Sequence, residues 1–205
     1  MTTVIPAPWH PSDELQIKSC LQNSGTIAFP TETVYGLGGN AFSESLVERI
    51  FQIKQRPSHK PLSLLIDPGW LPQLTVSLTA KIEKLMNQFW PGPLTLILAA
   101  HPQLPYFLRG PKHTVAVRFS SASIVQQLIS IGQCPIIGTS ANLSEQPETR
   151  QPSEVLSQLG DSLDLLIDGG EISGTRPSTI VDTSMSPYQI VRSGSISSVD
   201  LQPFL

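Results

Sequence analysis

The spacing of hydrophobic and polar positions along the chain predicts helices that alternate with short strands. Helices place apolar side chains three and four residues apart, whereas buried strands are short apolar runs bounded by glycine or proline. The helical pattern covers residues 12–23, 43–54, 78–89, 123–131 and 153–159. The strand pattern covers residues 26–29, 62–66, 94–99, 114–119, 135–139, 165–168, 179–182 and 189–192. This alternation indicates an α/β fold, and we expect one twisted, open and partly mixed sheet with flanking helices.

Local signals refine the ends of these elements. Ser43 precedes a helical stretch and is a candidate N-cap, because its hydroxyl can accept a bond from the first helical turn. The segment 30–40 contains Gly36, Gly38 and Gly39, so we predict a loop or a tight turn there. The length of 205 residues suits a single domain, which we place at residues 1–205.

Composition narrows the class of protein. Charged residues make up 14% of the chain and hydrophobic residues 40%, which indicates extensive burial and not disorder. The net charge of −3 argues against a broadly basic nucleic-acid binder, so an anion site must come from local clustering. The two cysteines have no metal-ligand spacing and are predicted to be reduced thiols. No secretory leader or membrane-length apolar run is visible, so we expect a cytoplasmic protein with no membrane partner.

Common catalytic signatures are missing from the sequence. It contains no GxxxxGK[ST] phosphate loop, no HExxH, no CxxC and no GxSxG. The four histidines have no ligand spacing, so we predict no metal site made by the protein.

Positive charge is concentrated in one short stretch. Arg49, Lys54, Arg56 and Lys60 fall within twelve residues, and Lys54 and Arg56 flank the end of a predicted helix. They could stabilise the helix C-terminus, where cations interact favourably with the helix dipole. Alternatively, they could form a polyphosphate clamp of planar guanidinium and compact ammonium groups.

Polar residues also follow several predicted strands. The run 30–38 places two threonine hydroxyls, a carboxylate and a phenol after a buried strand, which is where open α/β sheets bind ligands. Ser140 and Asn142 follow another strand and could be site residues or local capping groups. Arg118 and Arg192 lie at strand ends, where each could face a site or form a surface ion pair.

Five motifs occur together in the sequence and in a fixed order. They are FPTETVYGLG (29–38), KQRP (54–57), FWPGPLT (89–95), TVAVR (114–118) and SANLS (140–144). In this combination they resemble the YrdC-like family, over a core of about residues 12–194. The resemblance is to the short form of the family, which has no additional C-terminal domain.

The resemblance implies a fold and an activity. The family has an α/β fold with a large, positively charged concave groove. Its members are nucleotidyltransferases that join L-threonine, bicarbonate and ATP into threonylcarbamoyl-adenylate and release pyrophosphate. A tRNA-modification transferase takes up the product to make t6A. ATP chemistry commonly brings Mg²⁺ bound to the phosphates, so no dedicated metal cage is expected.

The resemblance also assigns roles to residues. It gives catalytic roles to Lys54 and Arg56, threonine contacts to Thr33, Arg118, Ser140 and Ser178, and ATP contacts to Arg56, Lys60, Asn142 and Arg192. Since three anionic partners must meet, positioning and electrostatics should supply most of the rate, without an acid–base histidine. Leu65 stands where some relatives have a polar residue, which weakens the expectation of strict threonine selectivity.

Two other functions fit parts of the sequence. A groove with Lys54, Arg56, Lys60 and Arg118 could bind double-stranded RNA or tRNA without catalysis, although the acidic net charge argues against broad phosphate binding. A carbamoyl-transferring domain of the hydrogenase-maturation type is related to the family. Those proteins are multidomain and carry cysteine-rich fingers, which this sequence lacks.

Overall fold

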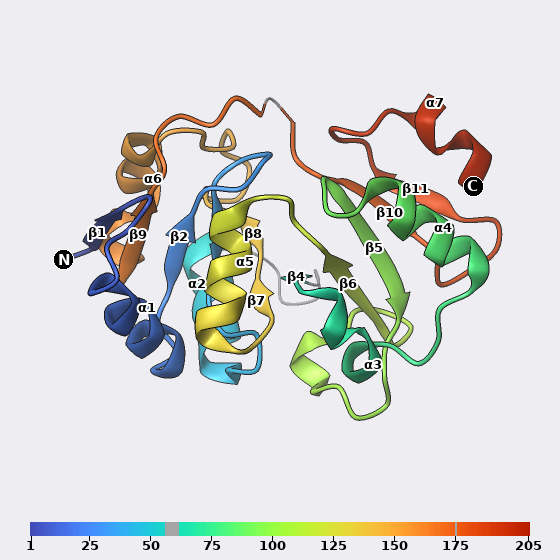
Figure 1. The fold of residues 1–205 in the computed structure, drawn as a ribbon, viewed down its shortest axis with the longest axis horizontal. Helices are drawn as coiled ribbons and strands as arrows, with labels where there is room; N and C mark the ends of the chain where they lie inside the picture. The colour runs from blue at the N-terminus through green and yellow to red at the C-terminus, as the bar shows by residue number, and fades with distance from the viewer. Residues whose placement is uncertain (56–61, 175) are drawn as a thin grey trace.

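The computed structural model describes residues 1–55, 62–174 and 176–205, which form two mixed sheets flanked by helices. The first sheet has the strand order β1-β9-β2-β3-β8, and the second has the order β11-β10-β5-β6-β4-β7. The sheets lie side by side, with both chain termini at the outer sides of the molecule (Figure 1). The α/β class is therefore confirmed, but the expected single sheet is wrong.

The central strands of the first sheet are buried on both faces. Its strands are β1 (Thr3–Pro6), β2 (Ile27–Phe29), β3 (Gly36–Gly38), β8 (Thr139–Ser140) and β9 (Leu165–Asp168), of which β1, β9 and β2 are parallel. Ile27 and Phe29 belong to one core cluster, and Ala28 between them belongs to the other. Successive strand residues point to opposite faces, so this all-apolar run fills two cores at once.

Four helices cover the two faces of the first sheet. Helices α1 (Asp13–Gln22) and α5 (Ser123–Gly132) pack together and supply apolar side chains to the same cluster as Ile27 and Phe29 (Figure 1). Helices α2 (Glu44–Lys54) and α6 (Pro152–Leu159) supply side chains to the cluster that contains Ala28.

The second sheet packs one face against the core and turns the other toward a cavity. Its strands are β4 (Ser63–Leu65), β5 (Leu94–Ala99), β6 (Thr114–Arg118), β7 (Ile136–Ile137), β10 (Thr179–Asp182) and β11 (Gln189–Arg192). Leu94, Leu96 and Leu98 of β5 are buried in the same core cluster as the apolar face of α4 (Ala80–Phe89). Thr95 and Ile97 point the opposite way and line a cavity. Only one face of this sheet is therefore closed by the core.

Shorter helical turns complete the described chain. They are α3 (Leu71–Leu74), α7 (Ser198–Leu201), η1 (Pro68–Trp70), η2 (Tyr106–Leu108), η3 (Gly160–Ser162) and η4 (Gln202–Phe204). The Ser43 prediction is confirmed, since its hydroxyl accepts a hydrogen bond from the Leu46 amide at 3.2 Å. Both cysteines are free, as predicted, and burial raises the pKa of Cys20 to about 12 and of Cys134 to about 11. No helix in the described ranges is long and apolar enough to cross a membrane.

Two departures from the sequence predictions shape the site. The predicted strand 135–139 divides at Gly138 into β7, which pairs with β4, and β8, which pairs with β3. The chain thus passes from the second sheet to the first at this point. The predicted loop around residues 36–38 is strand β3, whose glycine allows close packing: a Cβ added at Gly38 would lie 1.6 Å from the Ile137 carbonyl oxygen.

Candidate active site

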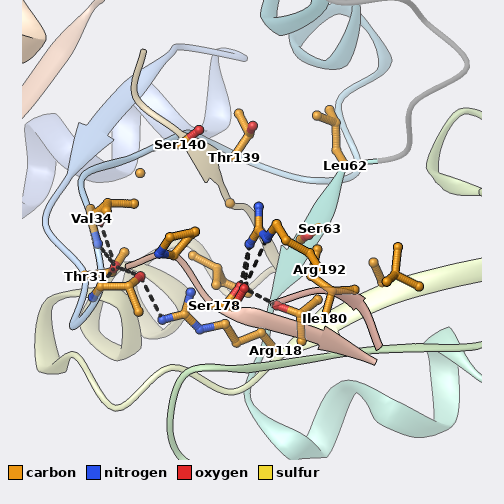
Figure 2. Close-up of a pocket in the computed structure, with 18 of the residues that line it drawn as sticks. Thr31, Val34, Leu62, Ser63, Arg118, Thr139, Ser140, Ser178, Ile180 and Arg192 are labelled. Carbon is orange, nitrogen blue, oxygen red and sulfur yellow. Dashed lines mark hydrogen bonds between the residues drawn. The ribbon is translucent and has the colours of Figure 1, made fainter. Parts of the chain in front are cut away.

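A cavity of about 260 Å³ lies between residues of the two sheets. Thr31 and Val34 lie across it from Leu62 and Ser63 (Figure 2). The remaining lining residues are Thr33, Tyr35, Gly36, Leu65, Thr95, Ile97, Ala116, Arg118, Gly138, Thr139, Ser140, Pro177, Ser178, Ile180, Val191 and Arg192. The cavity therefore has an apolar wall from the second sheet and polar groups at the strand ends.

The pleat of the second sheet determines which side chains reach this cavity. In β6, Val115 and Val117 enter the core, whereas Ala116 and Arg118 line the cavity. In β10, Val181 enters the core and Ile180 lines the cavity. An arginine on the cavity face of a strand is thus placed by the same alternation that buries its neighbours.

Arg118 is the most constrained charged group of the cavity. Its side chain is only 8% exposed. Nε donates to the Gly92 carbonyl at 3.2 Å, and Nη2 donates to Thr33 Oγ1 at 3.3 Å and to Glu32 Oε1 at 2.7 Å. None of these bonds, the ones that Arg118 makes to the described residues, involves Nη1. The guanidinium is therefore held along one side and can offer Nη1 to an anion, since an arginine fork binds carboxylates well.

Glu32 neutralises the charge of Arg118, although Glu32 itself does not line the cavity. Its Oε2 accepts a hydrogen bond from the Ser120 hydroxyl at 2.5 Å, and its Oε1 accepts one from the Ser121 amide at 3.3 Å. Burial works to raise the pKa of the Glu32 carboxyl, but the charge and hydrogen bonds of Arg118, with the Ser120 bond, hold the pKa below its usual value. Of the two alternatives for Arg118, the structure shows that it faces the cavity, and its ion pair with Glu32 is buried and not on the surface.

The threonine-rich loop before β3 presents an ordered hydroxyl. Thr31 Oγ1 accepts the Thr33 amide at 3.1 Å and donates to the Val34 carbonyl at 2.7 Å. The hydroxyls of Thr31 and Thr33 are 2.9 Å apart, and Thr33 is only 2% exposed. Thr33 thus reaches the cavity in a defined position beside Arg118.

A second arginine stands at the rim of the cavity. Arg192 ends the edge strand β11 and donates from Nη2 to the Ser178 carbonyl at 2.8 Å and to the Ser178 hydroxyl at 2.9 Å (Figure 2). The Ser178 hydroxyl lies 2.9 Å from Thr95 Oγ1. Arg192 is exposed, whereas Ser178 is 5% exposed, so the pair joins the cavity interior to its outer edge.

Lys54 and Asn142 lie outside the cavity lining and stabilise the loop that follows β8. Lys54 is 2% exposed, and its ammonium donates to the Ser140 carbonyl at 2.5 Å and to the Asn142 carbonyl at 2.7 Å. The Asn142 amide donates to the carbonyls of Leu143 and Gln146 at 2.9 and 2.7 Å. Both residues hold the loop after β8, and neither lines the cavity. Direct contact of either with phosphate stays a prediction.

The structure thus brings Thr33, Arg118, Ser140, Ser178 and Arg192 together around one cavity. The predicted phosphate residues Arg56 and Lys60 lie outside the described residues.

Comparison with known proteins identifies the family. A family model described as Telomere recombination, for Sua5, YciO and YrdC, matches residues 19–194. The chain belongs to this family. The predicted resemblance is therefore confirmed.

Two curated relatives of this Sua5/YciO/YrdC chain carry the same name. The threonylcarbamoyl-AMP synthase of Pyrococcus abyssi (strain GE5 / Orsay) is 39% identical over 171 residues, which are 83% of this chain and 50% of that protein. The threonylcarbamoyl-AMP synthase of Vibrio vulnificus (strain YJ016) is 37% identical over 182 residues, covering 87% and 97% of the two chains. This chain thus spans half the length of the archaeal relative and nearly all of the bacterial one.

A solved structure of the family supports the fold over the whole chain. The crystal structure of P. abyssi Sua5 complexed with L-threonine matches with a TM-score of 0.92 and 32% identity. The match covers 100% of this chain and 61% of that one.

Sequence reasoning missed several residues of this family member's site. Glu32 was seen only as part of a polar loop, and Thr95 lies within an apparently continuous apolar strand. Alternation along β5 could have placed Thr95 opposite the leucines, but only tertiary packing decides which face is open. The pairing of Glu32 with Arg118 has no local signal, because Glu32 lies in a loop of the first sheet and Arg118 ends a strand of the second.

Proposed function

We propose that this chain makes threonylcarbamoyl-AMP from L-threonine, bicarbonate and ATP, with release of pyrophosphate, for t6A modification of tRNA. The observation that carries the proposal is Arg118, buried beside Thr33 in a cavity of about 260 Å³. The names of its relatives and the threonine bound in P. abyssi Sua5 support the same conclusion.

The size and lining of the cavity suit a small amino acid. A cavity of about 260 Å³ is below the roughly 300–1,000 Å³ of pockets for drug-sized ligands. Arg118 Nη1 would bind the threonine carboxylate, and the hydroxyls of Thr33, Ser140 and Ser178 would bind its amine and hydroxyl. Leu65, on the apolar wall, would contact the methyl group.

The nucleotide would then extend from the rim of the cavity. Exposed Arg192 stands at this rim, and we propose that it contacts ATP together with Arg56, Lys60 and Asn142. The three cations Arg56, Lys60 and Arg192 would form the positive part of the groove. Mg²⁺ would arrive bound to the phosphates and not in a dedicated protein cage.

The chemistry requires the three substrates to be assembled. The threonine amine and bicarbonate form a carbamate with loss of water, and a carbamate oxygen attacks the α-phosphate while pyrophosphate leaves. Fixed cations reduce the repulsion among these anions, so positioning and electrostatics supply the rate. We infer that Lys54 acts by holding the loop that carries Ser140, and that Arg56 stabilises charge at the phosphates.

The test is pyrophosphate release with all three substrates and with each omitted in turn. We expect release only when threonine, bicarbonate and ATP are all present. Release that ignores bicarbonate would indicate a simple amino-acid adenylase. No release by folded protein with Mg²⁺ present would reject the synthase and favour binding of double-stranded RNA or tRNA.

The product would pass to a tRNA-modification transferase, because a mixed anhydride of a carbamate is short-lived in water. Since tRNA is the final acceptor, we place the protein in the cytoplasm.

A further inference from the structure

Glu32 connects the two sheets at the cavity without lining the cavity itself. It lies in the loop between β2 and β3 of the first sheet, whereas Arg118 ends β6 of the second. We propose that Glu32 is a positioning residue that fixes Arg118 for recognition of the substrate carboxylate. The proposal rests on the proposed function, since it concerns how the same site selects an α-amino acid.

The geometry of the guanidinium carries the first step of the argument. A guanidinium is planar and rigid, so fixing two of its nitrogens determines where the third points. Gly92 holds Nε at 3.2 Å, and Glu32 holds Nη2 at 2.7 Å. The Thr33 contact to Nη2 is longer, at 3.3 Å. Glu32 is therefore the strongest of the three restraints, because charge-assisted hydrogen bonds are about twice as strong as neutral ones.

Glu32 is itself held on more than one side. Ser120 and Ser121 bond its two carboxylate oxygens. Gly174 packs against its backbone, where an added Cβ would lie 2.7 Å from the Glu32 carbonyl oxygen and 2.3 Å from the Thr33 carbonyl oxygen. A carboxylate restrained at both ends can orient its partner, whereas a mobile one could not.

The charge balance gives the pair a second consequence. Arg118 and Glu32 together carry no net charge, so this pair attracts an anion through the directed Nη1 donors and not through an excess of positive charge. A phosphate group, with its higher charge, gains little there over the carboxylate of a zwitterion. Glu32 thus keeps the amino-acid pocket selective against the phosphates that must bind at the rim.

The alternative explanation is that the Glu32–Arg118 ion pair only stabilises the packing of the two sheets. Removing a purely structural pair would lower the free energy of unfolding and weaken the binding of all substrates alike. A positioning residue would weaken threonine binding while ATP binding and the rate at saturating threonine stay nearly unchanged.

The decisive variant is Glu32→Gln, which keeps the shape of the side chain and removes its charge. Asp164→Asn is a matched control, because Asp164 forms the other ion pair of the described ranges, with Arg49 at 2.7 Å, and does not line the cavity. Pyrophosphate release gives KM for threonine, KM for ATP and kcat. Calorimetry compares the binding of threonine with that of 1-amino-2-propanol, which lacks the carboxylate.

We expect Glu32→Gln to raise the threonine KM by about 10- to 100-fold, as for loss of a charged hydrogen bond, with kcat and the ATP KM unchanged. Binding of 1-amino-2-propanol should not change, and inorganic phosphate should become a competitor of threonine. Glu32→Asp should recover part of the threonine affinity. Asp164→Asn should match the wild type in every one of these measurements.

The outcomes separate the two levels of the proposal. If the wild-type protein neither binds threonine nor releases pyrophosphate, the proposed function fails and the role of Glu32 fails with it. If the wild type is active but Glu32→Gln behaves like Asp164→Asn, only the positioning role is rejected. Tighter threonine binding by Glu32→Gln would also reject it, because Glu32 would then be competing with the ligand for Arg118.

If thermal melts show that Glu32→Gln alone does not fold, a comparison of a double variant with Arg118→Gln keeps the proposal falsifiable. The double variant Glu32→Gln/Arg118→Gln should bind threonine no more weakly than Arg118→Gln, because Glu32 acts only through Arg118. A full additional loss in the double variant would overturn the inference.

Discussion

The two sheets use similar apolar strands for different purposes. In the first sheet, Phe29 and Ala28 point in opposite directions and both meet a packed core. In the second sheet, Leu96 meets a core but Thr95 faces the cavity. Similar apolar strands therefore form a strand buried on both faces in the first sheet and one wall of the cavity in the second. The difference lies in what covers the second face.

Phe29→Ala should produce the largest loss of stability and the clearest contrast. Phe29 is fully buried in the first sheet, and a Phe-to-Ala change in a core costs about 3–5 kcal/mol. Thr95→Ala on the cavity face removes one hydrogen bond, so it should lower the free energy of unfolding by only about 0.5–1.5 kcal/mol. Urea unfolding measures both changes. Equal losses would mean that the two faces are equivalent and would remove the basis of the comparison.

Arg118→Lys should affect catalysis more than any other conservative change at the cavity. Lysine keeps the charge but loses the fork that meets Glu32, Thr33 and the ligand. We expect kcat/KM for threonine to fall roughly 100-fold, as for loss of one or two charged hydrogen bonds, with the ATP KM unchanged. Steady-state pyrophosphate release measures both constants. Arg49→Lys, in the other ion pair, is the control, and equal losses would place Arg118 outside the threonine site.

Lys54→Met tests whether a residue that holds the loop after β8 affects activity differently from a residue that lines the cavity. Methionine fills similar space but leaves the Ser140 and Asn142 carbonyls without the ammonium donor. Turnover should fall about 10- to 100-fold, and the unfolding free energy should fall by about 1–3 kcal/mol. Because a displaced loop disturbs the whole site, threonine and ATP kinetics should suffer together. A defect confined to ATP would instead support direct phosphate contact.

The smallest effect is expected from the apolar wall of the second sheet. A pocket that buries one methyl group discriminates by about 10- to 200-fold, so serine should be a poor but measurable substrate. Leu65→Ala should reduce the ratio of threonine to serine kcat/KM, because it removes the surface that contacts the methyl. Leu156→Ala, exposed on α6, is the control. An unchanged ratio for Leu65→Ala would place the methyl elsewhere.

Local patterns in the sequence predicted most individual elements. Strand β5 was predicted with the bounds observed, and α2 within one residue, because apolar spacing and capping act between near neighbours. Strands β1 and β3 were missed. The first lies in a proline-containing segment without alternation, and the second is Gly-Leu-Gly, which has the composition of a turn. Residues 135–139 were predicted as one strand, because no local pattern shows that β7 pairs with β4 and β8 with β3.

The sequence by itself determined which runs could be buried and which side chains could carry charge or bind an anion. It also contained the family motifs that brought Thr33, Arg118 and Ser140 into one hypothesis. Only the tertiary structure decided that the strands form two sheets, that Lys54 turns inward, and that Glu32 orients Arg118. The physical reason is that periodicity records neighbours along the chain, whereas the contact between Thr33 and Arg118 joins residues 85 positions apart.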